Sequence, residues 1–301
     1  SDYDLSIFKW FNNGIKNERN RKINIKYGEN PNQKAYFVKH SNKNIFESKI
    51  HGKEIGYNNI LDISDGLSCL KEFKEATCVI VKHNNPCGVG SASNIKNAFL
   101  KALRSDPISS FGGIILLNRN IDMSLAKLIV SKFFEVVVAP SFNKVILKIL
   151  QTKKNLILIE SKNLDLNKKK NFKSVLSGVL YQDENSFKIS KSNIKLVTKK
   201  KSSTKNIDDL IFALKVAKHV KSNAVVLVKN KQTLGIGAGQ MSRLDSTRMA
   251  IIKYKDFFKN RKFVCASDAF FPFTDNIKLL LKNNCIGIIQ PSGSINDVKN
   301  I

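Results

Sequence analysis

The sequence predicts an α/β protein in which helices cover the faces of β-sheets. Between residues 76 and 160, short β-branched apolar runs alternate with longer segments whose apolar residues recur at helical spacing. The same alternation resumes after residue 206. With 301 residues, 42% of them hydrophobic, the chain can bury a large core in one domain or two smaller ones.

The first half begins its alternation with the strand ATCVIVKH (76–83), which is short, β-branched and bounded by a turn. A helix with a Ser or Asn N-cap is predicted to follow over 91–106. The later elements are strand 112–118, helix 121–134, strand 135–140, helix 142–151 and strand 155–160.

Residues 161–205 break this pattern with lysine, asparagine and serine, so they are predicted to connect two halves. Six elements follow: helix 207–220, strand 223–230, helix 243–258, strand 261–267, helix 275–283 and strand 285–290. Segments 79–103 and 225–254 each run strand, Val-Lys, glycine-bearing loop, helix. This weak similarity predicts one α/β unit present twice.

The charge favours anionic ligands, because the chain has 51 basic and 24 acidic residues and a net charge of +27. A nucleic-acid binder is the alternative function that this number supports. The lysines are scattered, however, and the densest runs (167–173 and 198–205) carry almost no aromatic residues for base stacking. We interpret them as solvated surface and expect no nucleic-acid partner.

The cysteines and the apolar runs bear on location. The five cysteines form no CxxC pair, which predicts reduced thiols in a cytoplasmic protein. No apolar run reaches 18 residues, and the N-terminus does not resemble a secretory signal, so no membrane partner is expected.

Lys82 and His83 are the leading candidates for chemistry, because they end a buried strand side by side. The plain alternative is a strand that leaves the core. His40 and His51 lie in polar, lysine-rich surroundings, and His219 ends a helix. An ammonium beside an imidazole disfavours a second positive charge, so His83 can accept a proton.

Position in the sheet supports the same choice. In open α/β sheets, ligands bind beyond the carboxyl ends of the strands. Lys82–His83 and Lys229–Asn230 are both at such ends.

A zinc deaminase signature fails at this strand end. That signature reads H-x-E and continues to P-C-x-x-C. Here Asn85 replaces the glutamate, and Gly90 replaces the second cysteine after Pro86–Cys87. One histidine and one cysteine cannot close a zinc site, so no metal is expected.

Two later loops could bind ligand. GIGAGQMSR (235–243) could bring backbone amides close to a ligand and clamp an anion with Arg243, or it could be an ordinary turn before a helix. SDAFFPFTDN (267–276) could form a slot for a flat heterocycle with Asp275 accepting hydrogen bonds, or its phenylalanines could be core.

Eight motifs together resemble one family. They are KYGENPNQ (26–33), GYNNILD (56–62), VKHNNPCGVG (81–90), SDPISSFGG (105–113), VAKHVKSNAVVL (216–227), GIGAGQMSR (235–243), SDAFFPFTDNI (267–277) and QPSGS (290–294). In this order they resemble the AICAR transformylase (phosphoribosylaminoimidazolecarboxamide formyltransferase) domain of the bifunctional purine-biosynthesis family. The match runs from about residue 20 to the end. SDYDLSIFKWFNN (1–13) is similar to the closing helix of the preceding IMP cyclohydrolase domain.

The resemblance implies formyl transfer from 10-formyltetrahydrofolate to the 5-amino group of aminoimidazole-carboxamide ribonucleotide (AICAR). The products would be formyl-AICAR and tetrahydrofolate. It also implies a homodimer with sites near the subunit interface, and two tandem cytidine-deaminase-like α/β units without zinc. A full-length parent would carry IMP cyclohydrolase as well.

The resemblance assigns roles to individual residues. His83 would be the general base, Lys82 would stabilise charge or assist departure of the folate nitrogen, and Asn223 would lie beside the base and amide. Candidate nucleotide contacts are Lys26, Tyr27, Gly112, Glu135, Arg243 and Phe270; candidate folate contacts are Ile108, Leu244, Pro272, Asp275 and Ser294.

The resemblance also implies domain boundaries: a cyclohydrolase tail and linker (1–19), a first unit (20–160), a connection (161–205) and a second, C-terminally incomplete unit (206–301). The family commonly has Arg-Tyr where this chain has Lys26–Tyr27, which exchanges a planar fork for a point charge. The family also continues past position 301 to a strand and a phosphate-binding arginine, so weaker AICAR binding is expected here.

Overall fold

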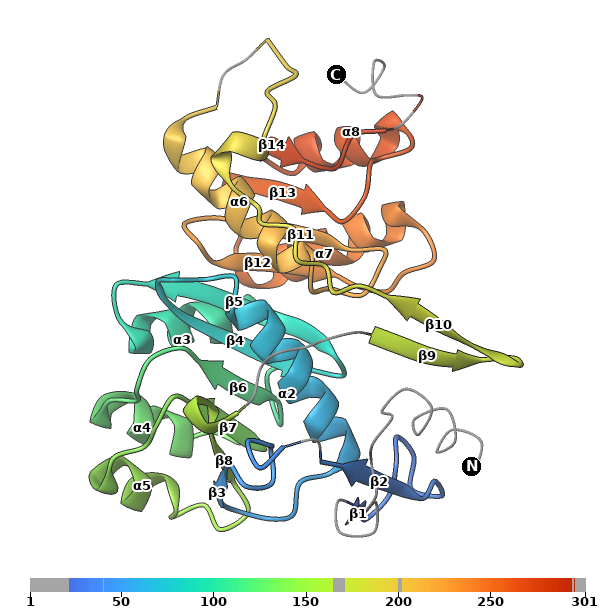
Figure 1. The fold of residues 1–301 in the computed structure, drawn as a ribbon. Helices are drawn as coiled ribbons and strands as arrows, with labels where there is room; N and C mark the ends of the chain where they lie inside the picture. The colour runs from blue at the N-terminus through green and yellow to red at the C-terminus, as the bar shows by residue number, and fades with distance from the viewer. Residues whose placement is uncertain (1–21, 40, 165–170, 200–201, 294, 296–301) are drawn as a thin grey trace.

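The computed structural model describes residues 22–39, 41–164, 171–199, 202–293 and 295 (Figure 1). The predicted cyclohydrolase tail (1–19), His40 and the folate candidate Ser294 lie outside these residues.

Two mixed sheets dominate the described chain, as the predicted α/β class requires. The larger has the order β3 (Lys49–His51), β8 (Ile157–Glu160), β7 (Val136–Ala139), β6 (Ile114–Leu117), β4 (Ala76–Lys82), β5 (Asn85–Ala92). The smaller has the order β12 (Thr233–Gly237), β11 (Val225–Val228), β13 (Phe263–Ser267), β14 (Cys285–Ile289). Strands β6, β7 and β8 are parallel, whereas β4 is antiparallel to both β5 and β6.

Helices cover both faces of each sheet. On the larger sheet, α2 (Tyr57–Leu70) packs on one face, and α3 (Ile95–Ser105), α4 (Met123–Val130) and α5 (Lys144–Leu150) pack on the other. On the smaller sheet, α6 (Thr204–Ala217) packs on one face, and α7 (Arg243–Phe257) and α8 (Thr274–Lys282) on the other. Strand residues alternate between the two faces: Val79 and Val81 face α2, while Cys78 and Ile80 face α3.

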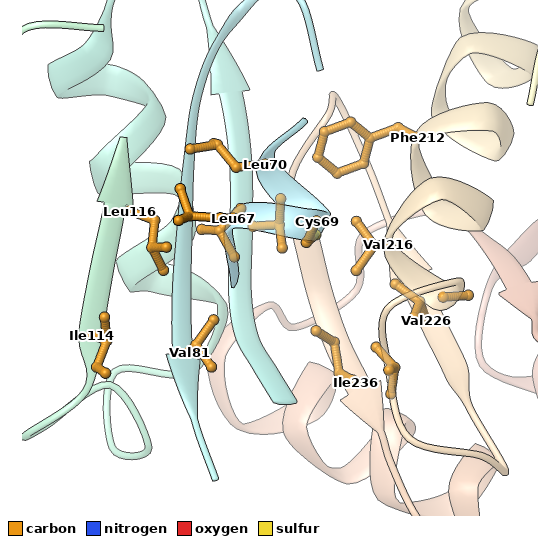
Figure 2. Close-up of a cluster of buried hydrophobic side chains, with 14 of the residues drawn as sticks. Leu67, Cys69, Leu70, Val81, Ile114, Leu116, Phe212, Val216, Val226 and Ile236 are labelled. Carbon is orange, nitrogen blue, oxygen red and sulfur yellow. The ribbon is translucent and has the colours of Figure 1, made fainter. Parts of the chain in front are cut away.

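One apolar core joins the two sheets. Leu67 and Leu70 of α2 lie in the same buried cluster as Phe212 and Val216 of α6 (Figure 2). Because α2 and α6 pack against each other, the two halves bury a shared core rather than two separate ones.

The sequence predicted that strand β4 ends in a loop at His83. In the structure the chain instead turns back at once into β5. His83 and Asn84 form a two-residue hairpin turn with positive φ at both positions. The second half repeats this turn at Asn230 and Lys231, between β11 and β12. The sequence did not predict these two hairpins, because a two-residue turn with positive φ at both positions usually has the sequence Asn-Gly or Asp-Gly.

Four of the glycines predicted to line loops, Gly88, Gly90, Gly235 and Gly237, lie in strands instead, whereas Gly239 follows β12 with a positive φ. A Cβ on Gly88 of β5 would collide with the carbonyl oxygen of Ala102 in α3, and one on Gly235 of β12 would collide with that of Ala250 in α7. Gly90 and Gly237 repeat this close approach one pleat further along each strand. Gly235 and Gly237 therefore serve helix packing rather than the ligand contact proposed for them.

The edge strands of the two sheets meet at β5 and β12. An isolated bridge pairs Gly90 with Gln232, and the Ser91 N–H donates to the Lys231 carbonyl at 2.9 Å. The buried Thr233 hydroxyl lies 2.7 Å from the Ser105 hydroxyl and accepts the Val89 N–H at 2.9 Å. Strands β5 and β12 are thus joined along a polar seam by these hydrogen bonds.

The remaining elements lie at the periphery. Two separate two-stranded sheets are β1 (Lys22–Ile25) with β2 (Ala35–Val38), and β9 (Asn171–Val175) with β10 (Gly178–Gln182). Short 3₁₀ turns occur at η2 (Ser161–Asn163) and η3 (Lys191–Asn193). Within the described ranges, no helix combines the length and apolar character needed to cross a bilayer.

We predict that Gly235→Ala destabilises the protein by roughly 1–3 kcal/mol, because the new methyl forces α7 off β12. The matched control is Gly178→Ala on exposed β10, where nothing lies within 4 Å of the added Cβ; its effect should stay within about 0.5 kcal/mol. Urea unfolding followed by circular dichroism measures both, and equal midpoints for the two variants would contradict the packing role.

Candidate functional site

Lys82 and His83 open into a cavity of about 430 Å³ between the two halves. The first half contributes Lys82, His83, Asn85, Pro86, Cys87, Asp106 and Ser109, and the second half contributes Ile236, Ala238, Gln240, Met249 and Lys253. Lys82 Nζ donates to the Phe111 carbonyl at 2.7 Å. The cation and the imidazole predicted from the sequence therefore border the same cavity.

Two carboxylates of α2 hold the His83 turn from below. Asp62 Oδ1 accepts the Asn84 N–H at 2.6 Å, and Asp65 Oδ2 accepts the Asn84 side-chain amide at 3.0 Å. Asp62 is buried, and burial raises the pKa of its carboxyl above the ordinary value although the Asn84 N–H and His83 oppose that shift. The turn is therefore fixed by buried polar bonds rather than by its own residue types.

An ion pair between Lys253 of α7 and Asp106 closes the cavity on another side. Asp106 also accepts the Ser109 N–H and hydroxyl at 2.8 and 2.7 Å. Burial alone would raise the pKa of Asp106, but these bonds from Lys253 and Ser109 outweigh it and lower the pKa. The cavity therefore contains a fixed anion paired across the two halves.

Asn223 lies close to the rim of this cavity. Its side-chain amide donates to the carbonyl of Gln240, a lining residue, at 2.9 Å, and its own carbonyl accepts the Ser246 hydroxyl at 2.8 Å. Two residues earlier, the Lys221 N–H donates to Asn85 Oδ1 at 2.9 Å. The segment that carries Asn223 is thus bonded directly to the strand that follows His83.

Arg243 begins α7 and forms an ion pair within the second half. Its Nη2 lies 2.9 Å from Asp268 Oδ1, and its Nε donates to the Ser267 hydroxyl at 2.8 Å. Burial would raise the pKa of Asp268, but hydrogen bonds from Arg243, Ser222 and the Ala224 N–H lower it overall. An anionic ligand would have to compete with Asp268 for this guanidinium.

Gly112 and Glu135 lie just before the amino ends of the neighbouring strands β6 and β7. Gly112, at φ +70°, donates its N–H to the Phe133 carbonyl at 3.0 Å. Glu135 accepts from Lys53 and Asn59, each at 3.3 Å, and lines a cavity of about 320 Å³ with Lys53, Lys132, Lys153 and Lys154. This cluster places positive charge near two candidate nucleotide contacts.

The sequence analysis expected ligands beyond the carboxyl ends of the strands, but the candidate site lies beside the amino ends of β6 and β7. Because β4 is antiparallel to β6, its carboxyl end lies beside the amino ends of β6 and β7. Lys229 and Asn230 lie at the opposite end of the β5–β12 seam, where Lys101 Nζ donates to the Asn230 carbonyl at 2.6 Å. Binding beyond the carboxyl ends is a rule for parallel strands. It fails here because β4, which carries Lys82, runs antiparallel to β6.

The other sequence candidates do not line the His83 cavity. Ile108 is 75% exposed, and Phe270 is 37% exposed beside the fully buried Phe271. Asp275 accepts the N–H and side-chain amide of Asn276, its neighbour in α8, at 2.7 and 2.9 Å. The remaining candidates, Lys26, Tyr27, Leu244 and Pro272, are also absent from this lining.

Sequence reasoning missed three charged residues of the site: Asp62, Asp106 and Lys253. Asp62 and Asp106 were visible as members of the motifs GYNNILD and SDPISSFGG. Lys253 had no signal, since it looked like one more lysine on a helix surface. Among the residues that the structure describes, no three His, Cys, Asp or Glu side chains gather as metal ligands would.

Comparisons with known proteins match most of the chain. The profile of the family described as AICARFT/IMPCHase bienzyme matches residues 1–253. A protein from Thermoanaerobacter sp. named bifunctional purine biosynthesis protein PurH is 46% identical over 92% of this chain and 54% of its own length. Proteins of the same name from Caldicellulosiruptor bescii and Bacteroides thetaiotaomicron are 43% and 42% identical, over 100% and 99% of this chain and 61% and 59% of their own lengths. The chain thus spans little more than half the length of these relatives.

Proposed function

The chain belongs to the AICARFT/IMPCHase bienzyme family, and we propose that it performs the formyl-transfer step of purine biosynthesis. The reaction moves a formyl group from 10-formyltetrahydrofolate to the 5-amino group of AICAR. The supporting observation is the pair Lys82–His83, held at the mouth of a cavity shared by both halves.

The geometry supports a general-base role for His83. In the proposed step the AICAR amino nitrogen attacks the formyl carbon, and the bond from that carbon to the folate nitrogen breaks. The amino proton passes to His83, and the departing folate nitrogen takes up a proton. Lys82 stabilises the charge that develops on the formyl oxygen or assists the departure of the folate nitrogen.

The nucleotide and the folate would contact residues on several elements. Lys26, Tyr27, Gly112, Glu135, Arg243 and Phe270 are proposed for AICAR, with Asn223 beside its base, and Ile108, Leu244, Pro272 and Asp275 for folate. The lysines around Glu135 favour an anionic ligand at that edge. No metal is required in this proposal, since the deaminase carboxylate and second cysteine are replaced by Asn85 and Gly90.

Two deaminase-like units, 20–160 and 206–301, joined by 161–205, remain our proposal for the domains. It is supported by the repeated arrangement of hairpin, glycine-bearing strand and helix in β4–β5–α3 and β11–β12–α7. A cytoplasmic location is supported by the five cysteines, which are all free.

A homodimer is also part of the proposal, and the hairpin β9–β10 supports it. This hairpin extends away from the body of the molecule, and within the part of the chain that the structure describes it pairs with no third strand (Figure 1). A lone two-stranded hairpin is marginally stable in water, yet Phe172 and Leu180 are 57% and 62% exposed on this one. A second copy of the chain would cover these side chains and could bring the scattered ligand candidates to the His83 cavity.

We predict that His83→Ala lowers kcat about 10²- to 10⁴-fold while AICAR binding is retained, because only proton removal is lost. Lys82→Ala should lose rate comparably. The matched control is Lys229→Ala, which changes the equivalent lysine of the second hairpin and should keep near-parental rate. Absorbance of tetrahydrofolate formation measures turnover, and calorimetry measures AICAR binding.

Three outcomes would each contradict part of this proposal. Near-parental activity in His83→Ala or Lys82→Ala would remove the assigned role from that residue. Tight, saturable DNA or RNA binding at near-physiological salt, without formyl transfer by the parent protein, would favour the nucleic-acid alternative raised by the +27 charge. Loss of activity in a chelator, together with stoichiometric zinc, would contradict metal independence.

We predict that Leu180→Asp on β10 weakens the dimer, since it places a charge in the apolar contact. The control is Val145→Asp on α5, another exposed apolar position far from the hairpin in the fold (Figure 1). Light scattering during gel filtration over a dilution series should show Leu180→Asp dissociating at higher concentration than the parent. Unchanged dissociation would remove the hairpin from the interface.

A further inference from the structure

We propose that Lys253 of α7 is a positioning residue for Lys82: through Asp106 it holds the loop 106–113, whose Phe111 carbonyl fixes the Lys82 ammonium beside the cavity. The two lysines belong to different halves of the chain, so the second half sets the geometry of a catalytic group in the first. The inference rests on the proposed function only where it treats Lys82 as a group that acts in formyl transfer.

The Lys82 side chain depends on one carbonyl group for its position. Its ammonium donates to the Phe111 carbonyl at 2.7 Å. Among the residues that the structure describes, this carbonyl is the only hydrogen-bond or ion-pair partner of that ammonium. Lysine carries its charge on a flexible four-carbon stem, so displacement of the carbonyl leaves the ammonium without a fixed place.

The Phe111 carbonyl belongs to a loop that is built around Asp106. The Asp106 carboxylate accepts the Ser109 N–H at 2.8 Å and the Ser109 hydroxyl at 2.7 Å. The Asp106 backbone carbonyl accepts the Ser110 N–H at 3.1 Å and the Ser110 hydroxyl at 2.7 Å, and the Phe111 N–H bonds to the Ile108 carbonyl at 3.2 Å. The side chain and the backbone of Asp106 together therefore determine where Phe111 lies.

The Asp106 carboxylate is buried and takes its counter-charge from the second half. Its side chain is 4% exposed and pairs with the Lys253 ammonium, which also lies 3.4 Å from the Ser109 hydroxyl. Within the described part of the chain, Lys253 is the only cation at ion-pair distance from Asp106. A buried carboxylate that loses its partner keeps the cost of burial without the compensating attraction, so the loop must move until water reaches the carboxylate.

The two halves are also joined by contacts that do not involve this loop. The Ser105 hydroxyl at the end of α3 lies 2.7 Å from the Thr233 hydroxyl, and Lys101 Nζ donates to the Asn230 carbonyl at 2.6 Å. These contacts remain when Lys253 is changed, so the loop should be displaced without separation of the halves. Lys101 also provides a matched control, since it is another lysine that bonds from one half to the other.

The first experiment compares Lys253→Met with Lys101→Met, each of which removes one ammonium that joins the halves. Both variants should lower the midpoint of thermal unfolding measured by circular dichroism. Only Lys253→Met should lower kcat, by roughly a hundredfold, because a small displacement of a catalytic group costs about that much. The KM for AICAR should change far less, since Lys82 is assigned to the transition state. A parental kcat in Lys253→Met would overturn the inference.

Two measurements without substrate separate this inference from the proposed function. Hydrogen exchange followed by mass spectrometry should be about tenfold faster for residues 109–113 in Lys253→Met, and parental in Lys101→Met. A crystal structure of Lys253→Met should show Lys82 Nζ out of hydrogen-bond reach of the Phe111 carbonyl. Parental exchange or an intact bond overturns the inference, even if the parent transfers formyl groups. A displaced Lys82, together with a parent that transfers none, supports the inference and contradicts the proposed function.

A second substitution decides whether Lys253 acts through Asp106 or touches the substrate itself. Asp106→Asn in the Lys253→Met background removes the unpaired buried charge, while the new amide oxygen can still accept the Ser109 N–H. The double variant should therefore fold and recover kcat to within about tenfold of the parent. This variant also carries the test if Lys253→Met alone does not fold. A folded double variant whose kcat stays roughly a hundredfold below the parent would show that Lys253 acts on the substrate directly, and would overturn the inference.

Discussion

The close approach of two helices to two glycine-bearing strands is the constraint on which the rest of the structure depends. Gly88 and Gly90 let the α3 backbone approach β5, and Gly235 with Gly237 let α7 approach β12. Because these helices sit so close, Ser105 of α3 reaches across to Thr233, and Lys253 of α7 reaches Asp106. The seam between the halves, and the cavity beside it, both follow from the absence of four Cβ atoms.

The candidate site combines a rigid turn with a wall from the other half. Lys82 continues the buried β4, while His83 occupies a turn that α2 holds through Asp62 and Asp65. Residues of β12 and α7 line the cavity beside His83 because the shared core between α2 and α6 holds the two sheets together. Chemistry in this chain would therefore depend on packing between segments more than 100 residues apart, and not on one loop.

The sequence predicted the parts whose signals are local. The β-branched residues of 76–83 predicted a strand. The N-cap residue predicted helix α3, and Asn94 does accept the Asn97 N–H at 2.9 Å. It missed β5 and β12 because glycine and proline weaken strand signals, and it missed α2 because Asp62, Asp65 and Gly66 are poor helix formers. Lys82 and His83 could be chosen from adjacency alone. Asp62 and Lys253 could not, because their importance comes from burial and from partners distant in sequence.

The central claim is that the nucleotide binds at the edge formed by the His83 turn and the amino ends of β6 and β7. A crystal structure of the protein with AICAR tests it most directly. The account predicts the aminoimidazole ring beside His83, with the nucleotide extending toward Gly112 and Glu135. A nucleotide at the opposite edge, beyond the carboxyl ends of β6, β7 and β8 near Asn118 and Ser161, would contradict it.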